Sequence, residues 1–157
     1  MERVTNITVS GLGGQGVLKV TDILAEVLFR TGFDVKKSEV HGMSQRGGSV
    51  SSEVRFGSDV ASPMVPEGES DFLVVLDPTQ IEVNLHKLKR GGVLIITDDV
   101  PTAKLKSPKM LNIMMLGALS AKFPNIGEEL WLTVLKDLLP EKFYEMNVEM
   151  FRLGRQQ

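Results

Sequence analysis

A cluster of glycines between a strand-like segment and a helix-like segment is the feature that most constrains the fold of this chain. Residues 4–11 predict a short strand, and the letters GLGGQG end it. Apolar residues then recur at three- and four-residue steps, at Val17, Val20, Leu24, Val27 and Leu28. This spacing predicts a helix with one apolar face that stops at Thr31-Gly32. The chain therefore begins with the order strand, glycine turn, helix.

The middle of the chain continues with extended segments. Residues 34–40 are expected to be extended, and residues 49–56 alternate apolar and polar side chains, as in a strand with one wet face. Residues 57–70 mix Gly, Ser and Pro without periodicity and predict a loop. Residues 72–76 are continuously apolar, which predicts a strand covered on both faces.

Helices dominate the expectation for the rest of the chain. A helix should run from Asp77-Pro78 to about Lys89, and Gly91-Gly92 should stop it before a buried strand at 93–97. Three more helices are expected, within residues 111–123, 127–139 and 141–153. We therefore predict a single domain over residues 1–157 with a three-layer α/β/α, Rossmann-like fold around a mixed, mostly parallel sheet.

Composition excludes several classes of protein. Hydrophobic residues make up 42% and charged residues 24%, as in an ordinary globular protein. The net charge of -2 and the lack of a basic cluster argue against nucleic-acid binding. No apolar run is long enough for a membrane helix and no signal peptide is visible, so a cytoplasmic location is expected. With no cysteine, the chain cannot hold an iron–sulfur cluster through thiolates.

The glycine turn has two readings at this point. Gly11, Gly13 and Gly16 have the G-x-G-x-x-G spacing, with Gly14 and Gln15 between them. The helix that follows offers free N–H groups and a dipole to an anion such as phosphate. An NAD site would also need an acidic residue about 20 positions on, for which Glu39 is the candidate. Alternatively, a tight crossover needs glycine whether or not a ligand binds.

A second glycine-rich segment, HGMSQRGGSV at residues 41–50, offers further polar groups. Gly47 and Gly48 permit unusual backbone conformations, while Ser44, Gln45 and Arg46 supply a hydroxyl, an amide and a guanidinium suited to phosphate or carboxylate. The plain alternative is that Arg46 is a solvated surface residue.

Taken together, the motifs resemble a known family. GLGGQGV at 11–17 followed by EVHGMSQRGGSVSSEVRFG at 39–57 is similar to the gamma-type subunits of the 2-oxoacid:ferredoxin oxidoreductases. NIMMLGAL at 112–119 and NVEMFRLG at 147–154 also fit that family. The letters HGMSQ resemble its indolepyruvate branch in particular.

The resemblance implies an accessory subunit that is inactive alone. The complete enzyme would decarboxylate an aryl pyruvate on thiamine diphosphate, reduce ferredoxin through iron–sulfur clusters and release an acyl coenzyme A. Thiamine diphosphate, Mg and the clusters would belong to a larger partner subunit, in agreement with the absence here of a G-D-G motif followed by asparagine and of any cysteine. Alone, the chain could assemble with itself. No nucleic acid and no membrane are expected as partners.

Within that family the two glycine-rich segments acquire roles. The helix start at Gly13–Gly16 and the side chain of Arg46 would suit the phosphates of coenzyme A. Ser44 and Gln45 would be polar contacts, and Gly47-Gly48 would let the loop approach the neighbouring subunit. The rival functions are a stand-alone NAD-binding protein and an oligomeric scaffold without a ligand.

Overall fold

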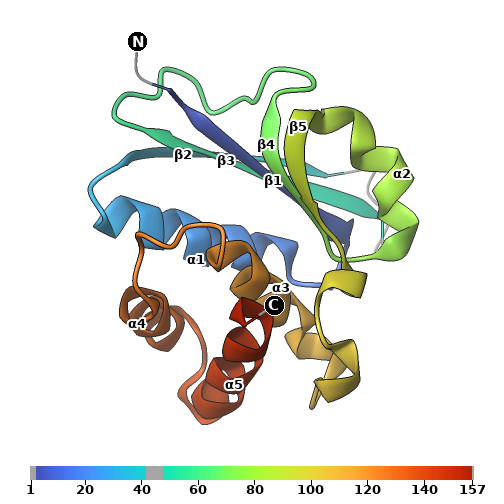
Figure 1. Ribbon diagram of the computed structural model, residues 1–157, viewed down its shortest axis with the longest axis vertical. Helices are drawn as coiled ribbons and strands as arrows, with labels where there is room; N and C mark the ends of the chain where they lie inside the picture. Colours follow the sequence, from blue (N-terminus) through green and yellow to red (C-terminus); the bar gives the residue numbers. More distant parts are fainter. Residues whose placement is uncertain (1–2, 42–47, 157) are drawn as a thin grey trace.

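A computed structural model describes residues 3–41 and 48–156, which form one five-stranded sheet with helices packed against it (Figure 1). The strands are β1 (Thr5–Leu12), β2 (Asp34–His41), β3 (Ser49–Gly57), β4 (Ser70–Val75) and β5 (Leu88–Ile95). The helices are α1 (Val17–Arg30), α2 (Ile81–Asn84), α3 (Leu111–Ser120), α4 (Glu128–Leu138) and α5 (Tyr144–Arg155). None of the described helices is long and apolar enough to cross a membrane.

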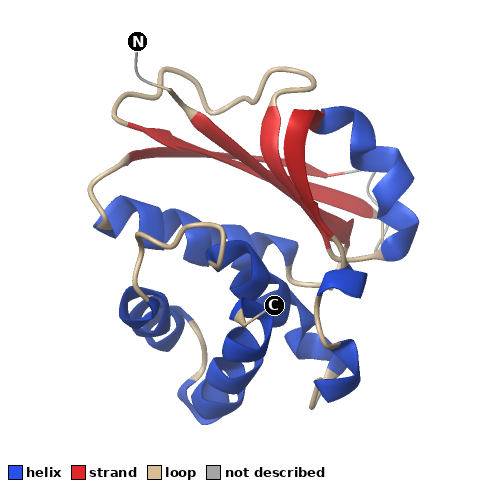
Figure 2. Ribbon diagram, in the orientation of Figure 1, coloured by secondary structure: helices blue, strands red, loops and turns tan. Residues whose placement is uncertain are grey.

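The sheet is mixed and is covered unequally on its two faces. Its strand order is β2-β3-β1-β4-β5; β1, β4 and β5 are parallel, and β3 is antiparallel to both of its neighbours. Of the described helices, α1, α3, α4 and α5 lie on one face, and the short helical stretch that contains α2 lies on the other (Figure 2). The predicted three-layer α/β fold with a mixed sheet is confirmed.

The alternating side chains of residues 49–56 point to opposite faces of the sheet, as predicted. Val54 and Phe56 are buried on the face of α1, and Ser52 on that face bonds Thr21 of α1 at 2.8 Å between the hydroxyl oxygens. The other face of β3 carries Ser51, which lies under the stretch around α2.

The thin layer around α2 is held to the sheet by polar contacts. Lys87 Nζ donates to Ser51 Oγ at 2.9 Å, and Asn84 Oδ1 lies 3.4 Å from the same hydroxyl as an acceptor. The pKa of Lys87 is lowered, because the effect of burial is larger than the opposite effect of the nearby Glu53 and Glu67 carboxylates. Hydrogen bonding offsets the cost of burying these groups, so a serine-lined sheet face can be covered here.

Two predictions about residues 77–97 are wrong in detail. Instead of one helix to about Lys89, the chain forms 3₁₀ turns at Pro78–Gln80 and Leu85–Lys87 around the four-residue α2. Gly91 and Gly92 do not stop a helix but lie inside β5, where the pairing register with β4 shifts. Gly91 has a φ of 81°, so these glycines serve an irregular strand rather than a helix end. The strand is also longer and less buried than the strand predicted at residues 93–97.

Helices α3 and α5 cross with their backbones in contact. At Gly117 of α3, an added Cβ would overlap the carbonyl oxygen of Phe151. At Gly154 of α5, it would overlap the carbonyl oxygen of Met114. The two motif segments NIMMLGAL and NVEMFRLG thus meet at this crossing, and each supplies a glycine that permits it.

We predict that Gly154→Ala strongly destabilises the fold, because the methyl group cannot enter without separating α3 from α5. The expected loss is about 3 kcal/mol or more in the free energy of unfolding, measured by urea denaturation. Gly127→Ala is the matched control, because among the described residues no atom beyond Gly127 and its chain neighbours lies within 4 Å of a Cβ built there. A similar, small loss in both variants would contradict this account of the crossing.

Candidate functional site

The glycine turn joins the end of β1 to the start of α1 through a left-handed residue. Gly16 has a φ of 80° and precedes the first helical residue, Val17. A Cβ at Gly16 would collide with the side-chain amide of Asn112 at the start of α3. Asn112 Nδ2 also lies 3.3 Å from the carbonyl oxygen of Gly16, to which it donates. Glycine is therefore needed here both for its conformation and for its size.

Side-chain hydrogen bonds fix the shape of the turn. Leu12 N donates to Gln15 Oε1 at 2.7 Å, and Gln15 Nε2 donates to Asp77 Oδ2 at 2.8 Å. The other carboxylate oxygen of Asp77 accepts from the hydroxyl and the backbone N–H of Thr79. These bonds, those from Thr79 above all, lower the pKa of Asp77 below its ordinary value. An ionised carboxylate after β4 thus anchors the turn after β1.

The turn lies beside the exit of the second glycine-rich segment. Gly13 N donates to the carbonyl oxygen of Gly48 at 2.9 Å. The next residue, Ser49, donates from Oγ to Oε1 of the buried Gln80 at 2.6 Å. Ser44, Gln45, Arg46 and Gly47 lie outside the described residues. Among the described residues, Gly13 and Gly48 bring the two segments together.

A hollow of about 300 Å³ opens at the start of α1. It is lined by the turn residues Leu12, Gly13, Gly14 and Gly16, by the first helical residues Val17, Leu18 and Lys19, and by Val50. The first turn of α1 has no acidic side chain, and the exposed Lys19 adds a positive charge to the helix dipole. This arrangement suits an anionic group such as a phosphate.

Lys19 was missed when the site was predicted from sequence, although its position in the first helical turn could have indicated it. Asp77 and Gln80 were also missed as supports of the site. They lie more than 60 and 30 residues along the chain from Gln15 and Ser49, respectively, so only the folded chain brings them together.

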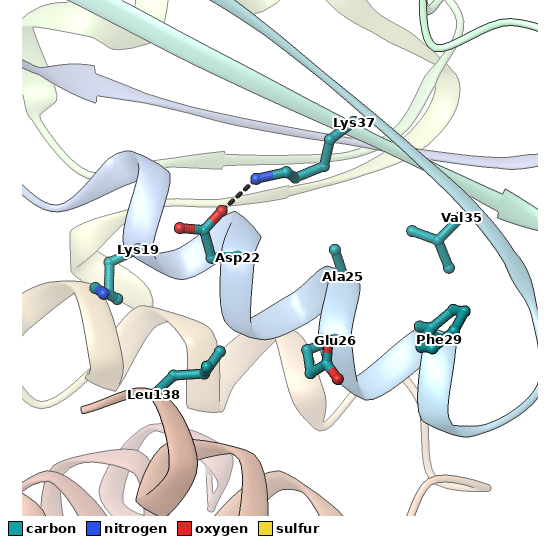
Figure 3. A pocket seen from close by; sticks show the side chains of 8 residues that line it. All are labelled: Lys19, Asp22, Ala25, Glu26, Phe29, Val35, Lys37 and Leu138. Carbon is teal, nitrogen blue, oxygen red and sulfur yellow. Dashed lines mark hydrogen bonds and ion pairs between the residues drawn. The ribbon is translucent and has the colours of Figure 1, made fainter.

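A groove of about 450 Å³ lies farther along α1 (Figure 3). Lys19 lines both this groove and the hollow at the glycine turn. Figure 3 shows Phe29 of α1 and Val35 of β2 at one end, and Lys37 of β2 paired with Asp22 across the groove. Phe29 is 64% exposed, so the groove offers apolar surface as well as charge.

Glu39 does not occupy the position that an NAD site requires. It lies on β2 and pairs in register with Ser52 of β3, which in turn pairs with Val9 of β1. The antiparallel strand β3 therefore separates Glu39 from β1, at about 10 Å for two strand spacings. In the dinucleotide fold the acidic residue follows the strand next to β1, so the predicted NAD alternative is not favoured.

We predict that Asp77→Ala lowers stability at neutral pH by about 1 kcal/mol, because the cap and the bond to Gln15 are lost. The carboxyl pKa of Asp77 is lowered in the folded state, so its stabilisation is complete above the ordinary value of 3.8 and is lost as the pH falls through the folded-state pKa. Urea unfolding of both proteins at neutral and at strongly acidic pH should show the difference shrinking with acidity.

The exposed Asp98, in a turn after β5, provides the control variant Asp98→Ala, which should change stability little at either pH. A cost of Asp77→Ala that is the same at both pH values would show that the charge of Asp77 does not support the turn.

Known proteins resemble this chain over nearly its whole length. A family model described as pyruvate ferredoxin/flavodoxin oxidoreductase matches residues 6–157. Indolepyruvate oxidoreductase subunit IorB of Thermococcus kodakarensis is 32% identical over 190 aligned residues, which cover 95% of this chain and 93% of that protein. Subunit IorB of Methanothermobacter thermautotrophicus is 31% identical, covering 95% of each chain. The first alignment is longer than the 157-residue chain, so that relative carries residues without a counterpart here.

Solved structures also resemble this chain. The gamma subunit of keto/oxoacid ferredoxin oxidoreductase from Geobacter sulfurreducens superposes with a TM-score of 0.80 at 26% identity, over 97% of this chain and 96% of that one. The 2-oxoglutarate:ferredoxin oxidoreductase from Magnetococcus marinus, solved with 2-oxoglutarate, coenzyme A and succinyl-CoA bound, shares the fold. Its TM-score is 0.83 at 24% identity, over 98% of this chain and 31% of that one. The chain belongs to the pyruvate ferredoxin/flavodoxin oxidoreductase family, as its motifs predicted.

Proposed function

We propose that this chain is the accessory subunit of a 2-oxoacid:ferredoxin oxidoreductase whose substrate is an aryl pyruvate such as indolepyruvate. The proposal is supported by its similarity to two IorB subunits along nearly their whole length. The observation that carries it is this whole-length match, and the hydrogen bond from Gly13 to Gly48 brings the two motif segments together at one edge of the sheet. Thiamine diphosphate and iron–sulfur clusters, held by a larger partner subunit, would supply decarboxylation and electron transfer to ferredoxin.

The part of this chain would be to bind the anionic end of coenzyme A and to complete the interface with the larger subunit. The free N–H groups at the start of α1 and the ammonium group of Lys19 would contact the phosphates. The groove that continues from Lys19 toward Phe29 would accept the uncharged chain of the same molecule. This assigns a use to surface that a scaffold without a ligand would leave unexplained.

Arg46, Ser44 and Gln45 would act at the subunit interface, in the segment that ends at Gly48. Gly47 and Gly48 would let that segment approach the partner closely. The guanidinium of Arg46 can hold a phosphate or a carboxylate through two parallel hydrogen bonds, which lysine cannot do.

We predict that Lys19→Ala raises the KM for coenzyme A about fivefold, because one charge-assisted contact to phosphate is lost. The KM for indolepyruvate and the kcat should stay as in the wild type. The measurement is the rate of ferredoxin reduction by the assembled enzyme. Lys122→Ala, which removes an exposed lysine just beyond α3, is the control. If the KM for coenzyme A is unchanged in Lys19→Ala, coenzyme A does not bind at this site.

We also predict that Arg46→Ala weakens both assembly with the larger subunit and the coenzyme A dependence of turnover. Co-purification and the same assay would show the two effects. Arg90→Ala removes an exposed arginine near the start of β5 and should leave both properties intact. If Arg46→Ala behaves like Arg90→Ala, Arg46 has no role at the interface or the anion site.

A further inference from the structure

A second pocket lies away from the glycine turn, between the start of α3 and the junction of α4 with α5. Its volume is about 460 Å³, within the range of small-molecule sites. Its lining includes Met110, Ile113, Leu139, Phe143 and Met146, which make it mostly apolar. Phe143 and Met146 are 41% and 37% exposed, whereas Met110 and Ile113 are buried at 8% and 2%. The pocket therefore has an apolar floor and an open apolar rim.

Asn147 places an unpaired polar group in this apolar pocket. The residue is only 6% exposed and lines the cavity. Within the described part of the chain, its side-chain amide makes no hydrogen bond, and its polar atoms are not sealed from the pocket. Because these atoms are open to the pocket, a ligand that carries a donor or an acceptor at this depth can pair directly with the amide.

The other asparagine of the pocket is already engaged. Asn112 donates from Nδ2 to the carbonyl oxygen of Gly16, and its Oδ1 accepts from the backbone N–H of Ile113 at 2.9 Å. Asn147 is thus the amide that is available to a ligand. Asn112 also separates this pocket from the glycine turn, so the two sites are distinct but share a wall.

The rim supplies positive charge. Lys106 and Lys109 line the pocket on the side of α3. Lys106 pairs with Glu149 at 3.1 Å, whereas Lys109 has no carboxylate partner among the residues that the structure describes. An anionic group of a ligand would therefore meet Lys109 while its body lies on the apolar floor.

We propose that this pocket binds a small molecule with a flat heteroaromatic ring, a hydrogen-bonding edge and an anionic tail. The ring packs on Met110 and Ile113, its polar edge pairs with the amide of Asn147, and the anion faces Lys109. A nucleoside monophosphate and an indolyl carboxylate share this chemistry. The inference does not depend on the proposed function, because it concerns residues outside the glycine-turn site.

Calorimetric titration of the full chain with four probes tests the ring edge and the charge separately. Adenosine monophosphate and indole-3-acetate represent the two sources, and binding of either one supports the site and identifies its source. Naphthalene-1-acetate lacks a polar ring edge and should bind about tenfold more weakly than indole-3-acetate. Indole-3-acetamide lacks the charge and should bind about threefold more weakly. Binding of neither adenosine monophosphate nor indole-3-acetate would overturn the proposal.

Asn147→Leu provides the decisive variant. It should abolish the preference for the indole over the naphthalene ring without lowering the melting temperature, because the lost amide has no partner among residues 3–41 and 48–156. A full preference retained in Asn147→Leu would show that binding occurs elsewhere. A large drop in melting temperature would show that the amide has a structural role, which would contradict the proposal.

A surface variant keeps the test independent of core packing. Lys109→Ala should weaken indole-3-acetate about threefold and leave indole-3-acetamide unchanged. Lys104→Ala, in the preceding turn, removes another exposed lysine that does not line the pocket and should change neither affinity. Equal effects of the two lysine variants would show nonspecific attraction of anions instead of a site.

Discussion

The contact between Gly16 and Asn112 joins the two halves of this molecule. Gly16 closes the turn after β1 in a left-handed conformation, and Asn112 lies in the first turn of α3, in the C-terminal helical layer. A side chain at position 16 would displace Asn112, and loss of the Asn112 amide would leave the carbonyl of Gly16 with its hydrogen bond from the backbone N–H of Val20 but without the bond to α3. Because α3 in turn touches α5 backbone to backbone, this contact links the glycine turn to the whole helical layer.

The candidate site is supported by groups that are neither in its motifs nor near them in sequence. Asp77 holds Gln15, and Gln80 holds Ser49, so the short segment after β4 anchors both the glycine turn and the exit of the second glycine-rich segment. Each anchor is a hydrogen bond of 2.6–2.8 Å between partly or fully buried residues. This preorganises the edge of the sheet where β1 and β4 end, which is where ligands bind in open α/β sheets.

Sequence patterns predicted the regular parts of this structure well. The three-residue and four-residue apolar steps marked α1, and the alternation in residues 49–56 assigned the faces of β3, because both elements bury one face against a continuous core. The segment around α2 was predicted as one helix because Asp77-Pro78 is a true helix-start signal. Its inner side chains, Gln80 and Asn84, instead bond polar groups of the sheet, a constraint that local sequence does not show.

The candidate site was predictable only in part. The G-x-G-x-x-G spacing located the turn, because such a crossover imposes glycine locally. It could not exclude Glu39 as an NAD ligand, because this depends on β3 lying between β2 and β1.

The claim that the chain serves a larger enzyme is tested most directly by the native mass of the protein isolated anaerobically from its own cells. We expect a complex with a large iron–sulfur subunit; a lone chain or a homo-oligomer would contradict the account.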